Sequence, residues 1–296
     1  METALIILNY NTAEKTIEMV QSAIDNNINK KFIIIVDNHS DNAQDKKLLE
    51  DYCLGNIKLI STPKNLGYGG ALNYAAKNLN TSFLCFCNSD MLFLENPFPE
   101  LEKFYKKSPN RGCVGIQQIF PDLSFQRSYG RFLSFKEILS KIFYLNILTP
   151  KKNSNIKKVE YVDGAFMFIS SKKFKEINGF DENFFFYFED MDLCKRLVDR
   201  GYLNFILPNK KIIHERGYST NKRGTLIYEF SIKNFNSGIF IFIDLHFKGF
   251  LYKKLYLNLL KIQCLKQIIV HFFLGRKNSK FIIAKNKDLL TAINSR

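Results

Sequence analysis

The chain has 296 residues but no tryptophan, only four histidines and no Cys-x-x-Cys pair. Its six cysteines therefore argue against a zinc site, and buried thiols in a reducing compartment explain them. The N-terminus lacks the basic segment that precedes the apolar core of a signal peptide, and no apolar stretch is long enough for a membrane-spanning helix. We therefore expect a protein that is made and kept in the cytoplasm.

Acidic residues are scarce as well: 28 Asp and Glu stand against 43 Lys and Arg, for a net charge of +15. This excess favours an anionic partner, such as a nucleotide, a nucleic acid or an acidic membrane surface. Helix-turn-helix, zinc-finger and RNA-binding aromatic motifs are missing, so only the charge supports a non-catalytic nucleic-acid-binding protein. With 46% hydrophobic residues, the chain can form a sizeable core in one large α/β domain, with or without an appendage.

Short apolar runs alternate with helical segments over the first hundred residues. The expected strands cover residues 4–8, 32–36, 57–60 and 83–87, and the expected helices cover about 12–26, 43–53 and 71–79. Fully apolar runs of this length are typical of parallel strands that are covered on both faces. The alternation predicts an α/β fold with a doubly wound, mainly parallel sheet and flanking helices, and ligands at the carboxyl ends of the strands.

The pattern loosens after residue 110. We expect further strands at 112–118, 165–170, 203–207 and 211–213, and helices near 135–144 and 189–200. From about residue 225 the chain is mostly basic, aromatic and amphipathic helix. The sequence thus predicts a ligand-binding and catalytic domain over residues 1–224 and a helical C-terminal appendage over residues 225–296.

Three polar segments follow predicted strands. Asp37 could bind a nucleotide base or ribose, or could belong to an ordinary polar turn. The segment 65–73 holds three glycines, which would admit a phosphate or sugar close to the backbone or form a plain turn; it matches neither the dinucleotide fingerprint nor a P-loop. Asp90 could hold a hard divalent cation, although a lone aspartate in a turn is usually structural.

The densest group of acids lies within residues 179–196, in a stretch dominated by phenylalanine. Its members are Asp181, Glu182, Glu189, Asp190 and Asp192. Acids beside so many rings are costly to bury unless something pairs with them or uses them. Apolar surroundings can also raise a carboxyl pKa, as a catalytic base requires. The helix dipole and an Asp192–Arg196 pair explain part of this pattern but not the embedding among aromatic residues.

In chain order, these four segments resemble the family 2 glycosyltransferases, which have a GT-A fold, and especially their bacterial rhamnosyltransferase-like branch. The resemblance covers about residues 3–220, with the motifs in the family's order and approximate spacing. It implies an inverting glycosyltransferase that uses a UDP- or dTDP-linked sugar. The acceptor would be a hydroxyl of a glycan or lipid-linked glycan in cell-surface polysaccharide assembly.

The resemblance also implies roles for individual residues. Asp190 matches the family's catalytic base. Asp163, Gly164 and Glu189 would line the pocket for sugar and acceptor. The residues that would bind the donor nucleotide are Asn9, Asp37, Asn65, Gly67, Asn73 and Asn88.

The implied metal is Mg²⁺ or Mn²⁺, held by Asp90. Asn88 stands where the family's metal motif has its first aspartate, which leaves the metal dependence open. His214 would be a further ligand of the metal or the diphosphate, or else a half-buried histidine at a strand end. Arg216 and Arg223 would steady the diphosphate or merely solvate a basic loop.

The C-terminal region and the reaction class leave alternatives open. A basic amphipathic tail can lie on an anionic membrane, here the inner face of the plasma membrane, or can form a cap or a homodimer contact. A nucleotidyltransferase acting on sugar phosphates is a rival on a similar scaffold. That class usually carries a glycine-rich, basic loop after the first strand, whereas residues 9–12 read Asn-Tyr-Asn-Thr. The sequence names neither the donor sugar nor the acceptor.

Overall fold

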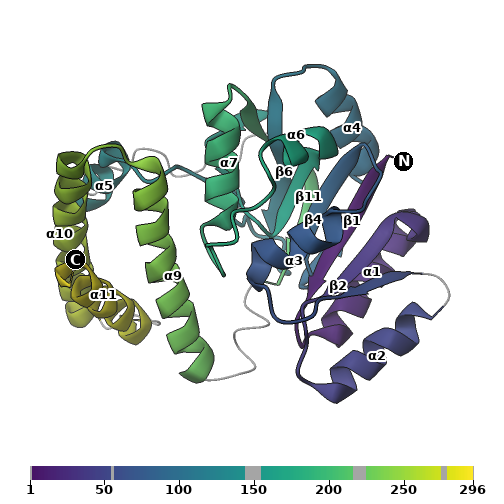
Figure 1. The fold of residues 1–296 in the computed structure, drawn as a ribbon, viewed down its shortest axis with the longest axis horizontal. Helices are drawn as coiled ribbons and strands as arrows, with labels where there is room; N and C mark the ends of the chain where they lie inside the picture. The colour runs from purple at the N-terminus through teal and green to yellow at the C-terminus, as the bar shows by residue number, and fades with distance from the viewer. Residues whose placement is uncertain (1, 55–56, 144–154, 216–224, 275–278, 296) are drawn as a thin grey trace. The chain divides into compact units, whose positions relative to one another are not determined.

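The structure is a computed structural model that describes residues 2–54, 57–143, 155–215, 225–274 and 279–295 (Figure 1). The chain divides into two compact units that are interleaved along the sequence. The first, here the sheet unit, comprises Met1–Gly130, Lys152–Phe185 and Glu189–Lys222. The second, here the helical unit, comprises Arg131–Lys151, Phe186–Phe188 and Arg223–Arg296. The predicted domain boundary between residues 224 and 225 stays a prediction.

One half of the central sheet is parallel. It consists of β1 (Thr3–Asn9), β2 (Ile33–Asp37), β3 (Lys58–Ser61) and β4 (Phe83–Asn88), in the order β3-β2-β1-β4. The strands β1 and β2 are almost wholly buried, which is why they appear in the sequence as unbroken apolar runs. The register sets Asn9 opposite Asp37 and Leu8 opposite Asn88, so these strands end in one polar row.

The other half of the sheet contains antiparallel pairs. The strand β10 (Phe166–Ser170) runs antiparallel to both β4 and β6 (Arg111–Ile119), and β11 (Leu203–His214) runs parallel to β6. The short strands β5 (Met91–Phe93) and β8 (Lys157–Val159) pair antiparallel with β11. The α/β class is confirmed. The two strands expected at 203–207 and 211–213 are one continuous strand, whose register shifts between Leu207 and Lys211.

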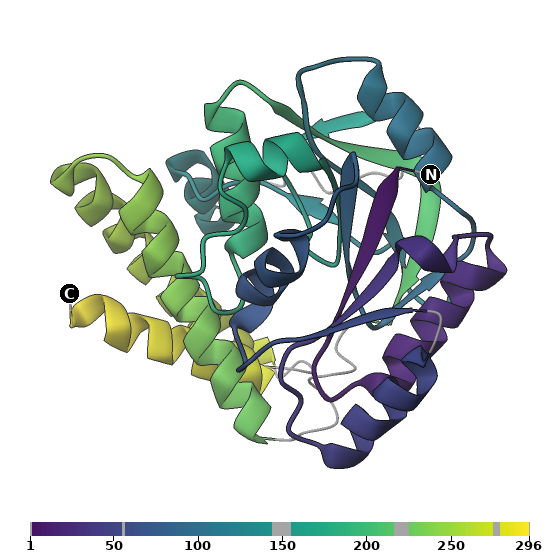
Figure 2. The same cartoon turned by 45° about the vertical axis from the view of Figure 1, so that its right-hand side comes forward.

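Helices flank this sheet. They are α1 (Ala13–Asp25), α2 (Ala43–Cys53), α3 (Gly67–Ala76), α4 (Phe98–Lys106), α6 (Ser171–Glu176) and α7 (Glu189–Asp199). Figure 2 shows α3 lying against the strands, where it packs on β1 and β2. The expectation of a helix from 71 was wrong by four residues, because the glycines form its first turn. At Gly69 a Cβ would lie 2.7 Å from the Phe180 side chain, so close packing requires glycine there.

The helical unit contains α5 (Phe135–Ile142), α9 (Thr225–His246), α10 (Phe250–Leu274) and α11 (Ser279–Asn294). The helix α5 confirms the one expected near 135–144, and α10 packs on both α5 and α11. The ring of Phe188 packs on Phe235 of α9, with ring centroids 5.1 Å apart. None of the described helices has both the length and the apolar character that crossing a membrane would require.

A buried asparagine, Asn204 of β11, joins three parts of the sheet unit. Its Oδ1 accepts the Cys113 N–H at 2.9 Å, and its Nδ2 donates to the carbonyl oxygens of Glu160 at 2.8 Å and Cys194 at 3.2 Å. The side chain is fully buried. Because a buried polar group without a partner is costly, each of these bonds matters more than a surface bond would.

We expect Asn204→Ala to destabilise the protein by about 3 kcal/mol, because three backbone groups lose their partner and two of these hydrogen bonds are fully buried. Urea unfolding measures this loss. The matched control is Asn209→Ala in the same strand, where the asparagine is exposed; we expect it to change stability by less than about 0.5 kcal/mol. Equal effects of the two substitutions would contradict the structural role of Asn204.

Candidate functional site

The carboxylate of Asp37 lies in a polar network at the ends of β1 and β2. Asn9 Nδ2 donates to Asp37 Oδ1 at 2.9 Å and to Ser40 Oγ at 3.1 Å. The Ser40 hydroxyl also donates to Asp37 Oδ1, and the Ser40 N–H donates to Oδ2 at 3.3 Å. Asp37 is only 4% exposed. Two predicted donor-binding residues, Asn9 and Asp37, are therefore direct partners.

This network continues to the end of β4. The Thr12 hydroxyl donates to Asn9 Oδ1 at 3.2 Å and lies 3.0 Å from Ser89 Oγ. Ser89 precedes Asp90, which is buried. A continuous chain of polar contacts thus links the surroundings of Asp37 with those of Asp90, as expected where parallel strands end side by side.

Asp90 faces His214, which lies at the end of β11. Asp90 Oδ1 and His214 Nε2 are 3.4 Å apart. On the other side of the ring, His214 Nδ1 lies 2.8 Å from Gln118 Oε1. Because an amide oxygen only accepts hydrogen bonds, Nδ1 donates in this contact, and Nε2 is the ring nitrogen that faces Asp90.

This pair of atoms fits a divalent cation. Bonds of about 2.0–2.2 Å from one ion would reach both a carboxylate oxygen and an imidazole nitrogen at this separation. The Gln118 contact is the kind of outer hydrogen bond that orients a ligating histidine. Within the described residues, no group of three or more His, Cys, Asp or Glu side chains is placed to hold a metal. Further ligands would then be water and substrate phosphates, as is usual for Mg²⁺.

Asp190 lies in the first turn of α7 and is held by backbone N–H groups. Gly164 donates to its Oδ2 at 2.9 Å and Met191 donates to its Oδ1 at 2.7 Å. The Gly164 carbonyl in turn accepts the Tyr68 hydroxyl at 2.6 Å. The next residue, Ala165, accepts the Asn88 N–H at 3.1 Å. The turn that holds Asp190 is therefore directly bonded to the end of β4, two residues from Asp90.

The environment of Asp190 raises the pKa of its carboxyl toward neutral pH. Burial, followed by the negative charge of Asp163, raises the pKa of Asp190 to about 7, although the Gly164 and Met191 N–H groups oppose this. The residue is nevertheless partly exposed. A partly accessible carboxyl with a pKa near the working pH has the properties of a general base.

Glu189 differs from its neighbour. It is 5% exposed, and its buried Oε2 has no hydrogen-bond partner among the described residues. Burial, followed by the charge of Asp190, holds the pKa of Glu189 well above its ordinary value. Burial therefore favours the protonated form of Glu189, in which the carboxyl can donate a hydrogen bond. Adjacent carboxyl groups with separated pKa values are typical of acid–base sites.

Asn73 has a structural role that the sequence did not indicate. Its Nδ2 donates to the Phe180 carbonyl at 2.9 Å and to Glu182 Oε1 at 3.0 Å, while its Oδ1 accepts the Phe180 N–H at 2.9 Å. Gly179 precedes this contact with a φ of +67°, which favours glycine. The amide clamps the loop before α7, so its assignment to the donor nucleotide stays a prediction.

The same loop is held from α7. Arg196 forms an ion pair with buried Asp192 at 2.7 Å and donates to the carbonyl oxygens of Ile177 at 2.6 Å and Gly179 at 2.8 Å. The predicted Asp192–Arg196 pair is thus confirmed and explains one of the five acids. The loop and the first turn of α7 are fixed from both sides.

Asn65 and Gly67 lie beside the end of β2. Asn65 Oδ1 accepts from Asn38 Nδ2 and from the Gly67 N–H, both at 3.0 Å. Gly67 has a φ of +74°, and a Cβ there would lie 2.3 Å from the Phe185 carbonyl oxygen. Sequence reasoning missed Asn38; its place directly after Asp37 at a strand end was the available signal.

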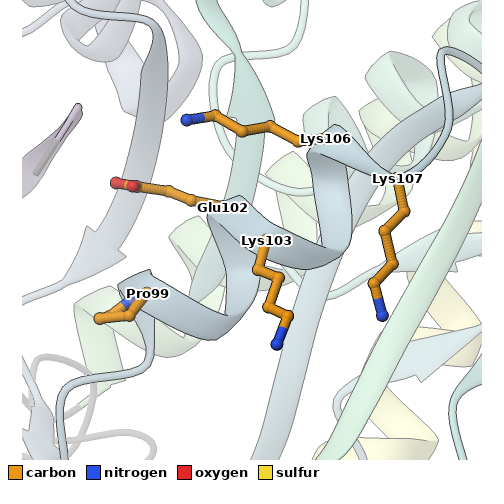
Figure 3. A pocket seen from close by; sticks show the side chains of 5 residues that line it. All are labelled: Pro99, Glu102, Lys103, Lys106 and Lys107. Carbon is orange, nitrogen blue, oxygen red and sulfur yellow. The ribbon is translucent and has the colours of Figure 1, made fainter.

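A hollow over α4 is unrelated to these residues. It is lined by Pro99, Glu102, Lys103, Lys106 and Lys107. Figure 3 shows that the charged side chains of these residues point in different directions, so they do not converge on a common centre. Arg216 and Arg223 lie outside the described residues.

Known proteins resemble this chain in sequence. The family model "Glycosyl transferase family 2" matches residues 4–177, and "N-terminal domain of galactosyltransferase" matches residues 147–219. The N-acetylglucosaminyl-diphospho-decaprenol L-rhamnosyltransferase of Mycobacterium tuberculosis is 24% identical over 211 residues, which are 64% of this chain and 68% of that protein. The low-salt glycan biosynthesis hexosyltransferase Agl10 of Haloferax volcanii is 26% identical over 209 residues, which are 66% of this chain and 61% of that protein.

Solved structures establish the fold. The mannosyltransferase PcManGT of Pyrobaculum calidifontis, in complex with GDP-Man and Mn²⁺, matches with a TM-score of 0.58 and 13% identity over 99% of this chain and 75% of that chain. The predicted GT-A fold is confirmed. Because the first family model covers more than half of the sequence, the chain belongs to glycosyl transferase family 2 and is a nucleotide-sugar glycosyltransferase of glycan biosynthesis.

Proposed function

We propose that this enzyme transfers a sugar with inversion from a nucleoside-diphosphate donor to a hydroxyl of a glycan or lipid-linked glycan, with Asp190 as the base. One observation carries the proposal: the Asp190 carboxyl is oriented by the Gly164 N–H and has a pKa of about 7. The M. tuberculosis relative, whose name describes a decaprenol-linked acceptor and rhamnosyl transfer, supports a lipid-linked acceptor and a rhamnosyl-type donor.

The donor would lie across the carboxyl ends of the parallel strands. Asp37, oriented by Asn9 and Ser40, would bind the base, and Asn88 would lie beside the ribose or phosphates. Asn65 and Gly67 shape the adjoining backbone. This placement follows the general rule for ligands of open α/β sheets.

Asp90 and His214 would hold Mg²⁺ or Mn²⁺. Such an ion would neutralise the charge that develops on the departing diphosphate. His214 is prepared for this role because Gln118 fixes the position of its proton. The PcManGT structure, which contains Mn²⁺, supports a divalent cation.

In the reaction, the acceptor oxygen would attack the anomeric carbon while the bond from that carbon to the diphosphate oxygen breaks. The hydroxyl proton would pass to the ionised Asp190 carboxylate. Glu189 in its protonated form, which burial favours, would donate a hydrogen bond in the same pocket, beside Asp163 and Gly164. Cytoplasmic location at the inner face of the plasma membrane, and a homodimer, stay predictions.

We expect Asp190→Asn to lower kcat by about 10²–10⁴-fold, the scale of general-base catalysis, and to leave donor binding intact. Initial rates measure the first effect, and thermal shift with a panel of UDP-, dTDP- and GDP-sugars measures the second. The control is Asp199→Asn, the same change at an exposed position of α7, which we expect to be neutral. Unchanged turnover in Asp190→Asn would remove Asp190 from the reaction.

We expect kcat/KM to rise with pH and level off above about 7, because only ionised Asp190 accepts a proton. Below that value the rate should fall about tenfold per pH unit.

The contribution of Asp190 to the stability of the fold should instead decrease as the pH rises. The folded state binds this proton more tightly than the unfolded state, so the ionised carboxyl destabilises the fold at pH 8 and not below pH 4.

Asp190→Asn should therefore raise the free energy of unfolding at pH 8, on the order of 1–2 kcal/mol after allowance for solvent screening, and leave it unchanged near pH 4. Calorimetry at the two pH values measures the difference. A flat pH–rate profile between pH 5 and 8, with equal stability changes at both pH values, would be incompatible with the raised pKa.

We expect His214→Ala to raise the Mn²⁺ concentration needed for half-saturation at least about tenfold. Removing only a hydrogen-bond partner of a metal ligand typically lowers metal affinity by that factor, and this variant removes the ligand itself. Electron paramagnetic resonance of free Mn²⁺ measures binding without turnover. His271→Ala, which changes a histidine of the helical unit, serves as the control. If a chelator left activity intact, or if His214→Ala bound Mn²⁺ normally, the assigned cation site would be wrong.

A further inference from the structure

The helix α10 exposes a row of apolar side chains, here called the α10 stripe. Its members recur every three or four residues along the helix, apart from one gap at Asn258: Leu251, Leu255, Ile262, Leu265, Ile269 and Phe272. Their exposed fractions lie between 48% and 73%. Residues at this spacing lie on one face of a helix. Contiguous exposed apolar surface of this kind marks an interaction site.

The stripe is distinct from the face that α10 uses within its own unit. Tyr256, Leu260 and Cys264 recur every four residues and are 2%, 6% and 1% exposed. This second face accounts for the packing of α10 in the helical unit, where it contacts α5 and α11. The helix is therefore apolar on two faces, and intramolecular packing in the helical unit explains only one of them.

The charges beside the stripe indicate what covers it. Between Phe250 and Leu274 there is no acidic residue, and there are four lysines. Lys254 and Lys261 each precede a stripe residue, Leu255 and Ile262, so they border the same edge of the stripe. The other two lysines have partners within the helical unit: Lys253 with Asp244, and Lys266 with the carbonyl oxygens of α5.

These charges argue against a second copy of the helix as the occupant. Pairing two α10 stripes would bring lysine-bordered edges together with no carboxylate on either helix, and like charges across an interface are unfavourable. Asn258 would also interrupt the apolar seam. An anionic lipid surface matches both the apolar stripe and its lysines, because the acyl chains accept the apolar side chains and the headgroups attract the lysines.

We propose that the α10 stripe, with Lys254 and Lys261 along its edge, is a docking surface for anionic phospholipid membranes. The exposed rings of Phe250 (81%) and Phe273 (79%) extend the same surface at both ends of the helix. The inference goes beyond the proposed reaction and does not rest on it, because lipid binding is measured without donor or acceptor.

The test is co-sedimentation of the full chain with vesicles. We expect binding to phosphatidylcholine mixed with phosphatidylglycerol, weaker binding to phosphatidylcholine alone, and loss of affinity as salt rises. The double variant Leu255→Glu/Ile262→Glu should lose at least about tenfold in affinity, because it places charge on the inserted face. Lys254→Gln/Lys261→Gln should lose roughly fivefold for each lysine, on anionic vesicles only.

The matched control is Thr291→Glu/Asn294→Glu on α11, which adds the same two charges at exposed positions. We expect it to bind vesicles as the unchanged chain does. Circular dichroism shows whether each variant is folded. No binding by the unchanged chain, or normal binding by folded Leu255→Glu/Ile262→Glu, would overturn the proposal. A dimer that this variant converts to a monomer would show instead that a second copy covers the stripe.

Discussion

The hydrogen bond from the Gly164 N–H to the Asp190 carboxylate is the contact on which the candidate site depends. It joins the first turn of α7 to the turn before β10, which is itself bonded to the end of β4 through Ala165 and Asn88. Tyr68 of α3 fixes the Gly164 carbonyl from the other side. Three elements distant in the sequence therefore set the position of one oxygen atom relative to Asp90 and the strand ends.

The chain concentrates carboxyl groups where they are expensive to ionise. Asp192 is paired with Arg196, so its burial is compensated. Among the described residues Glu189 has no such partner, and burial holds its pKa well above the ordinary value, while Asp190 is partly exposed and its pKa is raised to about 7. Three acids of one helix turn therefore differ in their burial and pairing. This division explains how a run of acids among aromatic rings is tolerated and what chemistry it permits.

Much of the fold was predictable because parallel strands buried on both faces appear in sequence as short apolar runs. The early start of α3 was not, because glycine normally weakens a helix; only the close approach of Phe180 explains Gly69 there. Candidate site residues could be named from the sequence where a motif marks them, as for Asp37, Asp90 and Asp190, and their roles stay predictions. Asn38, Gln118 and Tyr68 were missed because their importance comes from partners that folding brings close. The α10 stripe was likewise hidden, since both faces of that helix are apolar and only the structure shows which is covered.

The central claim is that Asp190 is a carboxyl group whose proton is held until near-neutral pH by burial and by Asp163. Difference infrared spectroscopy on protein with labelled aspartate carboxyls, with Asp190→Asn as the reference, measures that titration directly. A signal assigned to Asp190 with a midpoint of about 7 would agree with the structure. A midpoint near the ordinary value of 3.8 would contradict it, and with it the assignment of Asp190 as the base.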